Sequence, residues 1–286
     1  MIHQREQKSL SGFFDSPAGG LQAGVKKKDE IRRAESRPFY RGLLSGEDRE
    51  IYDVMEKSLS GHGEQLHLPR NIEGEKALSL SRFVTLDRPE LYWTKGDFEV
   101  ICRSENGLLI RWADLLSPEK TAEADSRIFR MLEEMSFLRE TDPVRRAENL
   151  QNWMLTRVGY GISGDRAGFD GGQTVYSALI RGKSLCMGIA KTVQLLLSLS
   201  GTECITVMGS LRGAGAAGHA WNMIRTEGIW RHIDLTMAYP EMRAIRHRAQ
   251  PDGTMGFLFR TGEEMTGTHI LSSRIPYPDE IRSGMS

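Results

Sequence analysis

The stretch GKSLCMGIA at residues 182–190 decides the fold, because it places a cysteine at the start of an apolar helix. Ser184 is a suitable N-cap residue, and Gly201 predicts where the helix ends. Between them, apolar side chains recur at helical spacing at Ala190, Val193, Leu196 and Leu197. The pattern therefore predicts a helix whose first turn contains Cys186.

A cysteine in the first turn of a helix has two possible roles. The unpaired backbone N–H groups and the helix dipole favour a thiolate there, and the same groups can donate to an oxyanion on a substrate. We expect Gly188, which has no side chain, to let a substrate approach the sulfur. The alternative is that Cys186 is a small buried apolar residue, the usual state of a free cysteine. The choice depends on whether an imidazole and a carboxylate lie nearby.

The segment from His219 to Asp234 predicts a β-hairpin that supplies both groups. Two apolar, loosely alternating stretches flank Thr226-Glu227-Gly228, which is typical of a tight turn. A turn centred between positions 226 and 227 pairs His219 with Asp234. Directly paired residues have Cβ atoms about 4.5–5.5 Å apart, a distance that suits a hydrogen bond between carboxylate and imidazole. The sequence therefore predicts contact between His219 and Asp234.

Three short motifs, taken together, resemble the transglutaminase-like superfamily, a branch of the papain-like cysteine fold, as found in bacterial proteins. They are CMGIA at 186–190, HAWN at 219–222 and DLT at 234–236, and residues 176–182 resemble the lead-in to the nucleophile. The resemblance implies an α+β fold in which a nucleophile helix packs on an antiparallel sheet. It also implies a catalytic triad of Cys186, His219 and Asp234.

Further site residues follow from the same resemblance. Tyr176 or Gln173 could supply a second oxyanion donor, and the sequence does not choose between them. We expect Trp221 to pack beneath the triad, and His232 to lie at the surface.

Two positions depart from the family's pattern. Ile189 stands where an aromatic residue is common, and Met237 stands where a tryptophan is common. These substitutions affect the expected substrate pocket rather than the triad.

The rest of the chain divides into three predicted regions: a loosely attached arm at 1–37, a helical and hairpin region at 38–120, and a transglutaminase-like domain with a C-terminal extension at 121–286. Ser45 and Asp48 resemble a capping box that begins a helix. Predicted helices cover residues 45–59, 75–85, 126–138 and 143–158, and Asp142-Pro143 indicates where the last one begins. Predicted strands cover residues 98–102 and 108–112, which form a hairpin around Asn106-Gly107, and 204–208.

Composition excludes several classes of protein. Lysine plus arginine equals aspartate plus glutamate, at 38 each, so no net charge attracts nucleic acid or an anionic membrane. The three cysteines are too scattered for a disulfide framework, and the histidines (His62, His67, His247 and His269) have no ligand-like spacing. We therefore expect free thiols and no metal or other cofactor. No apolar run reaches the ~18 residues of a membrane span and no signal peptide is evident, so we expect a cytoplasmic protein without membrane insertion.

These expectations point to a thiol-dependent acyl-transfer enzyme acting on a protein or peptide. Cys186 attacks a carbonyl, His219 moves the proton and Asp234 orients the imidazole. Water as the acceptor gives a cysteine peptidase or deamidase, which we favour because it needs no second substrate site. A lysine amine as the acceptor gives a protein-glutamine transglutaminase. The third alternative is a catalytically silent binding module, which the substitutions at Ile189 and Met237 motivate. The sequence does not indicate the oligomeric state.

Overall fold

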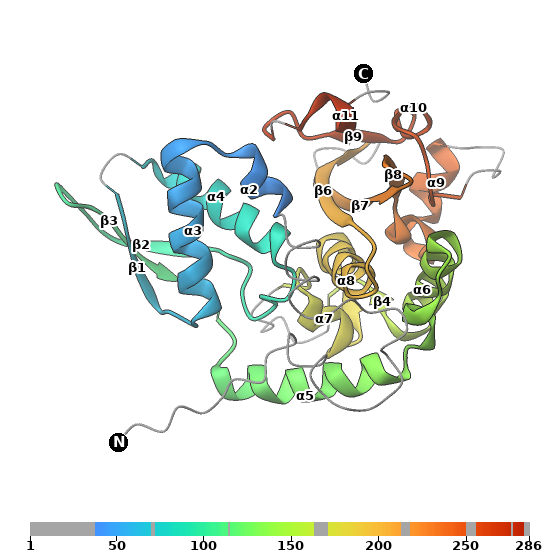
Figure 1. Ribbon diagram of the computed structural model, residues 1–286, viewed down its shortest axis with the longest axis horizontal. Helices are drawn as coiled ribbons and strands as arrows, with labels where there is room; N and C mark the ends of the chain where they lie inside the picture. Colours follow the sequence, from blue (N-terminus) through green and yellow to red (C-terminus); the bar gives the residue numbers. More distant parts are fainter. Residues whose placement is uncertain are drawn as a thin grey trace.

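The computed structural model describes residues 38–69, 72–113, 115–162, 171–212, 218–249, 256–275 and 277–282. The predicted arm at 1–37 and most of the glycine-rich loop before His219, at 213–217, lie outside these residues. The protein combines helices with antiparallel sheets, which confirms the α+β prediction. Figure 1 shows two lobes, one from the first third of the chain and one from the last half, with helix α5 running beneath both.

The first lobe packs helices against a small sheet whose strand order is β1-β3-β2. Its elements are α2 (Phe39–Leu43), α3 (Gly46–Ser60), β1 (Gln65–Leu68), α4 (Gly74–Asp87), β2 (Phe98–Ser104) and β3 (Gly107–Trp112). The predicted hairpin and both predicted helices are confirmed, and strand β1 was not predicted. The predicted capping box is wrong, because Ser45 is the N-cap of α3 but its side chain makes no capping hydrogen bond.

Two helices connect the lobes. Helix α5 (Pro118–Glu134) begins well before the predicted start at residue 126, because Ser117 caps it and Pro118 occupies its first position. A short 3-10 helix, η2 (Ser136–Arg139), takes up the remainder of the predicted helix. Helix α6 (Pro143–Arg157) begins as predicted, with the Asp142 carboxylate accepting a hydrogen bond from the Val144 N–H at 2.9 Å.

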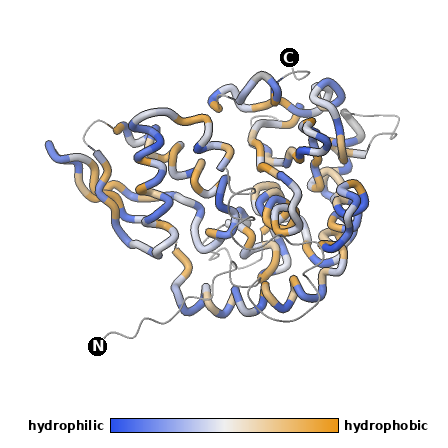
Figure 2. Tube along the Cα trace, viewed as in Figure 1, coloured by the Kyte–Doolittle hydropathy of each residue, from blue (hydrophilic) through white to orange (hydrophobic). Residues whose placement is uncertain are grey.

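The second lobe is built on a four-stranded antiparallel sheet in the order β8-β7-β6-β9. The strands are β6 (Cys204–Leu211), β7 (Gly218–Thr226), β8 (Ile229–Ile233) and β9 (His269–Leu271). Helix α8 (Cys186–Leu199) packs on this sheet, and the Asn222 amide on β7 donates to the Ala190 carbonyl at 2.9 Å. Figure 2 shows α8, at the centre of the second lobe, to be rich in apolar residues. The predicted nucleophile helix on an antiparallel sheet is therefore confirmed.

Short elements complete this lobe around the start of α8. Strand β4 (Gly159–Tyr160) pairs in parallel with β5 (Lys183–Ser184), the segment that leads into Cys186. The others are α7 (Val175–Leu179), η3 (Leu235–Ala238), η4 (Pro240–Met242), α9 (Arg243–Ala249), α10 (Gly262–Met265) and α11 (Asp279–Arg282).

Buried hydrogen bonds hold the two lobes together. The Tyr40 hydroxyl on α2 donates to the Thr206 carbonyl on β6 at 2.6 Å. Gln194 on α8 donates to the Leu86 carbonyl on α4 at 2.9 Å and accepts from the Thr206 N–H, also at 2.9 Å. These contacts fix the first lobe against the sheet that carries the candidate site. The predicted domain boundary near residue 120 stays a prediction.

The β7–β8 hairpin differs from its predicted register. Thr226 pairs with Ile229, so Glu227 and Gly228 form the two-residue turn, with φ of 53° and 81°. Positive φ at both central positions is the geometry of a type I′ turn, and this moves the turn centre by one residue. The predicted direct pairing of His219 with Asp234 is therefore wrong. Asp234 follows the last paired residue, Ile233.

Within the described residues, no helix is both long and apolar enough to cross a bilayer.

Candidate active site

Cys186 is the first residue of helix α8. The N-cap is Leu185 rather than the predicted Ser184, because the Ser184 hydroxyl instead donates to the Gly172 carbonyl at 3.0 Å. The Leu185 N–H donates to the same carbonyl at 2.9 Å, so the approach to the helix is tied to the loop before α7. Cys186 is partly exposed and free, and no side chain of the N-cap residue occupies the N–H groups of its turn.

Gly188 packs against the protein itself. A Cβ at this position would lie 2.2 Å from the Ser184 hydroxyl, 2.8 Å from the Thr174 carbonyl and 2.9 Å from the Gly172 carbonyl. Glycine is therefore required for the first turn of α8 to fit against the loop. Our expectation that Gly188 admits a substrate stays a prediction.

His219 and Asp234 form a fully formed buried pair. His219 Nε2 lies 2.7 Å from Asp234 Oδ2, and both side chains are almost completely shielded from solvent. Asp234 is the N-cap of η3, where its Oδ1 accepts a hydrogen bond from the Thr236 N–H at 2.9 Å. The contact forms despite the shifted register because Asp234 lies just beyond the strand, where its side chain reaches back to the start of β7. The predicted contact between the two residues is thus confirmed.

The electrostatics of His219 favour its charged form. Burial alone lowers the pKa of an imidazole, but the charge and hydrogen bond of Asp234, together with the Cys186 thiol, raise the pKa of His219 to about 10. Burial acts to raise the pKa of Asp234, and the His219 charge and the imidazole hydrogen bonds outweigh it and hold that pKa well below its usual value. The ring therefore interacts with a carboxylate and with a thiol.

Trp221 packs on one face of the His219 imidazole and is itself held by His232. The Trp221 ring stacks on His219, with centroids 5.9 Å apart and an interplanar angle of 17°, as expected for packing beneath the triad. Trp221 Nε1 donates to His232 Nδ1 at 2.9 Å. The expected surface position of His232 is wrong, because this residue is completely buried; burial, with His269 nearby, lowers its pKa to about 3. A neutral His232 accepts the hydrogen bond from the indole N–H and so fixes the orientation of the Trp221 ring.

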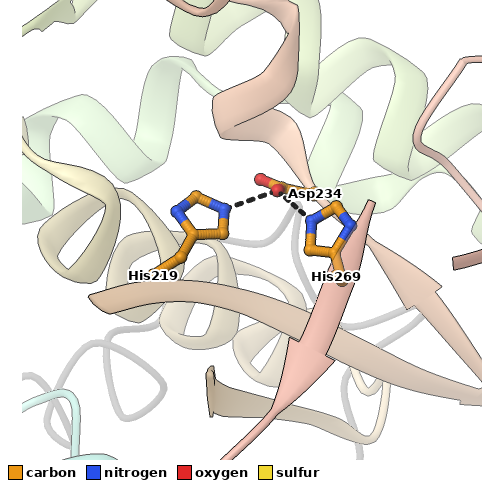
Figure 3. Close-up of side chains that lie close together, drawn as sticks. All are labelled: His219, Asp234 and His269. Carbon is orange, nitrogen blue, oxygen red and sulfur yellow. Dashed lines mark hydrogen bonds and ion pairs between the residues drawn. The ribbon is translucent and has the colours of Figure 1, made fainter. Parts of the chain in front are cut away.

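A second histidine shares the carboxylate. Figure 3 shows His219 and His269 on opposite sides of Asp234, each pointing a ring nitrogen at the same oxygen. His269 Nε2 lies 2.9 Å from Asp234 Oδ2, and His269 is completely buried on β9. The sequence analysis missed this residue because it lies on a separate strand, with no motif that links it to the hairpin.

Tyr160 is another neighbour that the sequence analysis did not single out. Burial first, and then the negative charges of Cys186 and Asp234, raise the pKa of Tyr160 to about 12. Its place follows from the parallel pairing of Tyr160 with Ser184, two residues before the cysteine. This pairing brings a phenol hydroxyl to the thiol side of the site.

The proposed oxyanion donors lie in different settings. Gln173 is exposed beside Gly172, whose carbonyl holds the residues before Cys186. Tyr176, the second residue of α7, stacks on Tyr92 of the first lobe, with ring centroids 6.3 Å apart. The choice between the two as a second oxyanion donor stays a prediction.

His219, Asp234 and His269 are also the group in the described part of the chain that could hold a metal, since their ligand atoms lie within 4.8 Å of one another. Ligands on a tetrahedral ion with bonds near 2.0–2.1 Å lie about 3.3 Å apart. The carboxylate oxygen is closer than this to both nitrogens, at 2.7 and 2.9 Å, which is the spacing of hydrogen bonds. The arrangement fits two imidazole N–H donors better than an ion. The expected absence of a metal stays a prediction.

Comparison with known proteins agrees with the motifs. The sequence profile of the transglutaminase-like superfamily matches residues 132–235, which contain Cys186, His219 and Asp234 but not His269. A sequence search of curated proteins gives no match.

Several solved structures are similar to parts of the chain. A candidate cysteine protease from Cytophaga hutchinsonii is 17% identical, with a TM-score of 0.33 over 41% of this chain and 40% of that one. A TGase is 12% identical, with a TM-score of 0.34 over 60% and 50%. The periplasmic domain of TgpA from Pseudomonas aeruginosa, bound to ethylmercury, is 18% identical, with a TM-score of 0.32 over 48% and 57%. The chain thus spans about half the length of these proteins.

Proposed function

We propose that this transglutaminase-like chain is a cysteine acyl-transfer enzyme that hydrolyses peptide, isopeptide or carboxamide bonds. The observation that carries the proposal is the buried His219–Asp234 pair, with Nε2 and Oδ2 2.7 Å apart, near a thiol that contributes to the raised pKa of His219. A thiol, an imidazole and a carboxylate in this order are the nucleophile, the general base and the group that orients the base.

The geometry assigns a role to each nitrogen of His219. Nε2 faces Asp234, so Nδ1 is the nitrogen that exchanges a proton with the Cys186 sulfur. The thiolate attacks the substrate carbonyl, and a C–S bond forms. His219 Nδ1–H then protonates the leaving nitrogen as its C–N bond breaks. In the second half, Nδ1 takes a proton from water while water attacks the thioester, and the thiolate is regenerated.

The oxyanion of each tetrahedral intermediate needs donors close to Cys186. Backbone N–H groups in the first turn of α8 supply them, and the helix dipole adds to the effect. Gln173 is our candidate for a second donor because it is exposed on the loop that holds this turn. Trp221 acts through His219, which it supports, and not on the substrate.

Hydrolysis is favoured over amine transfer because it needs only one bound substrate. Transfer would place a lysine amine where water attacks the thioester, and it gives a protein-glutamine transglutaminase from the same three residues. The partner in either case is a protein or peptide. A cytoplasmic location, and the absence of nucleic-acid partners and cofactors, remain expectations.

A cavity of about 1010 Å³ lies beside Asp234 and is large enough to hold part of a peptide substrate, although Cys186 and His219 are not among the residues that line it. Buried apolar side chains, Met237 and Phe257, form part of its lining. Exposed charged residues, Glu241 and Arg243, line it as well. Such a mixed surface suits a segment of polypeptide that carries both apolar and charged side chains.

The second candidate function is a binding module without turnover. The departures at Ile189 and Met237 favour it. Both residues are buried, Ile189 inside α8 and Met237 in η3, where Met237 also lines the cavity beside Asp234. Neither residue removes a group that the chemistry requires.

The test is hydrolysis of a peptide library, including glutamine-containing and isopeptide-linked members, analysed by mass spectrometry with and without a primary amine. Cys186→Ala should abolish product formation, whereas Cys102→Ala, an exposed cysteine on β2 of the other lobe, should leave it unchanged. New amide products in the presence of amine would establish transfer. Turnover that survives in Cys186→Ala contradicts the proposal. No turnover, with Cys186 no more reactive than free cysteine, favours the binding module.

A further inference from the structure

His269 reaches the site from outside the segment that resembles the superfamily. It lies on β9, which pairs with β6 at the edge of the sheet, with Leu211 opposite His269. The profile match ends at residue 235. The contact with Asp234 therefore belongs to the C-terminal part of this chain, beyond the three motifs.

The hydrogen bonds around His269 define which nitrogen carries its proton. Nε2 lies 2.9 Å from Asp234 Oδ2, which as a carboxylate oxygen only accepts, so Nε2 is protonated. Nδ1 lies 2.6 Å from the Thr268 hydroxyl. Burial, with the His219 charge nearby, outweighs Asp234 and lowers the pKa of His269, so the ring is neutral at neutral pH. A neutral ring with its proton on Nε2 accepts a hydrogen bond from the Thr268 hydroxyl at Nδ1.

We propose that His269 is a positioning residue that clamps the Asp234 carboxylate from the side opposite His219. This proposal rests on the proposed function, because it assigns a role in the same site. The neutral His269 ring donates a hydrogen bond to Asp234 without adding charge to the site. This bond stabilises the buried carboxylate and fixes the direction of Oδ2. The orientation of Oδ2 in turn fixes the ring of His219.

The clamp accounts for every acceptor site that Asp234 uses. Oδ1 accepts a hydrogen bond from the Thr236 N–H at 2.9 Å, and Oδ2 accepts one hydrogen bond from each imidazole. Without His269, only Thr236 and His219 itself would orient the carboxylate. The other titratable neighbour of His269 in the described residues is His232, which is held by Trp221, and aromatic rings of Trp221 and Phe257 fill the remaining sides.

The sheet is shaped so that β9 can come this close. Gly209 on β6 pairs with Leu271 on β9, and a Cβ at Gly209 would lie 2.0 Å from the Ile270 carbonyl and 2.8 Å from the Trp221 ring. Glycine at this position therefore allows the backbone of β9 to dock beside Trp221 and present His269.

Removing the clamp should change His219 measurably. The His269 N–H places a partial positive charge next to Oδ2 and so weakens the field of this oxygen, which also stabilises the His219 imidazolium. Replacing His269 with leucine leaves this oxygen to His219 alone, so the pKa of His219 should rise. Loss of orientation should lower kcat by about 10- to 100-fold, the range expected for one hydrogen bond to a charged group, with KM unchanged.

The first measurement is nitrogen-15 NMR of the histidine rings in the full-length protein, titrated with pH, in the wild type and in His269→Leu, His269→Gln and Thr268→Val. In the wild type, His269 should show a protonated Nε2 and an unprotonated Nδ1. His269→Leu should raise the pKa of His219. His269→Gln, whose amide can donate to Oδ2, should restore values near the wild type. Thr268→Val should show part of the effect while the ring is kept.

His62→Asn is the matched control, because it also replaces a histidine that packs on a tryptophan ring, here Trp93, but this histidine is partly buried and lies in the first lobe. It should leave the pKa of His219 unchanged. If His269→Leu does not fold, the comparison of His269→Gln with Thr268→Val carries the test.

Three results would overturn the clamp: a His219 pKa that is the same in His269→Leu and the wild type, a His269 ring protonated only at Nδ1, or zinc bound to both rings in the purified protein. The NMR measurement needs no substrate, so it remains decisive if no peptide is hydrolysed. Conversely, turnover that is equal in His269→Leu and the wild type would refute the clamp and leave the proposed function standing.

Discussion

Each lobe contains an aspartate that accepts three hydrogen bonds, and the two carboxylates differ sharply in proton affinity. Asp87, at the end of α4, is partly buried, and Asp234, after β8, is completely buried. The donors to Asp87 are the Tyr40 N–H, the Arg41 N–H and the Tyr52 hydroxyl, each at 2.9 Å. The donors to Asp234 are the Thr236 N–H, His219 and His269. Burial raises the pKa of Asp87 to about 6, whereas that of Asp234 is well below its usual value.

The difference teaches that the charge of the donors, rather than their number, decides whether a shielded carboxylate stays ionised. The donors to Asp87 are neutral, and its nearby cation, Arg88, is engaged with Glu56 at 2.6 Å. Asp234 instead faces an imidazole whose proton affinity it raises. Asp87 therefore serves as a structural link that holds the first turn of α2, and Asp234 as one half of an ion pair.

The largest expected contrast comes from the same substitution at both sites. Asp234→Asn should lower kcat/KM by about 10³- to 10⁴-fold, as expected for a base that loses its orienting carboxylate. The amide cannot accept from the imidazoles on one atom and from the Thr236 N–H on the other, so one donor always faces an NH₂ group. Asp87→Asn should leave kcat/KM within about twofold, since it lies in the other lobe. Equal losses in the two variants would contradict the comparison.

Removal of the Asp87 carboxylate should affect stability much more than activity. Asp87→Ala removes the acceptor of three donors and should lower the free energy of unfolding by about 3 kcal/mol. Urea unfolding measures this loss. Asp53→Ala is the control, because it breaks the more exposed ion pair with Arg41 and should cost less than about 1 kcal/mol. Similar costs for the two variants would show that Asp87 is not a structural link.

Both sites should lose stability as pH rises, but over different pH ranges. The folded pKa of Asp87, about 6, lies above that of an unfolded aspartate, so the native state binds the extra proton. Relative to Asp87→Asn, the wild type should therefore gain stability as pH falls from about 6.5 to 4, by at most about 3 kcal/mol.

The raised pKa of His219 has the same sign of effect on stability, but it acts at higher pH. The contribution of His219 to the free energy of unfolding is fully present below the unfolded pKa of about 6.5, and it is lost as pH rises toward the folded pKa of about 10. Relative to His219→Gln, the wild type should lose stability over that range. The measurement is the free energy of unfolding as a function of pH. If the wild-type curve runs parallel to that of Asp87→Asn at low pH, the raised pKa of Asp87 is refuted. If it runs parallel to that of His219→Gln at high pH, the raised pKa of His219 is refuted.

The smallest expected effect sharpens the comparison at the level of one donor. Tyr52→Phe removes the hydroxyl that donates to Asp87 and should lower the free energy of unfolding by about 1 kcal/mol. It should also raise the pKa of Asp87 further, because a hydrogen bond to the charged form is lost. NMR titration of the carboxyl carbon measures the shift. An unchanged pKa would mean that the hydroxyl does not stabilise the carboxylate.

Local patterns predicted much of this fold. The apolar spacing after Cys186 predicted helix α8, Asn106-Gly107 predicted the β2–β3 hairpin, and Asp142-Pro143 predicted the start of α6. In each case the residues that decide the structure are close neighbours in the chain. The hairpin pattern likewise predicted that His219 and Asp234 meet.

Contacts between distant segments explain what was missed. Ser184 does not cap α8, because the Gly172 carbonyl takes its hydroxyl. His269 comes to Asp234 only through the pairing of β9 with β6, which no local pattern encodes. His232 was expected at the surface because a strand pattern does not show which face another segment covers, and here Arg260 pairs with His232.

The rate of alkylation of Cys186 by iodoacetamide between pH 5 and 9 tests the central claim most directly, which is that His219, held by Asp234, keeps the sulfur reactive. At neutral pH the rate in the wild type should be well above that of free cysteine. In His219→Gln it should fall to about the rate of free cysteine. A wild-type profile identical to that of free cysteine, or one unchanged by His219→Gln, would contradict the account.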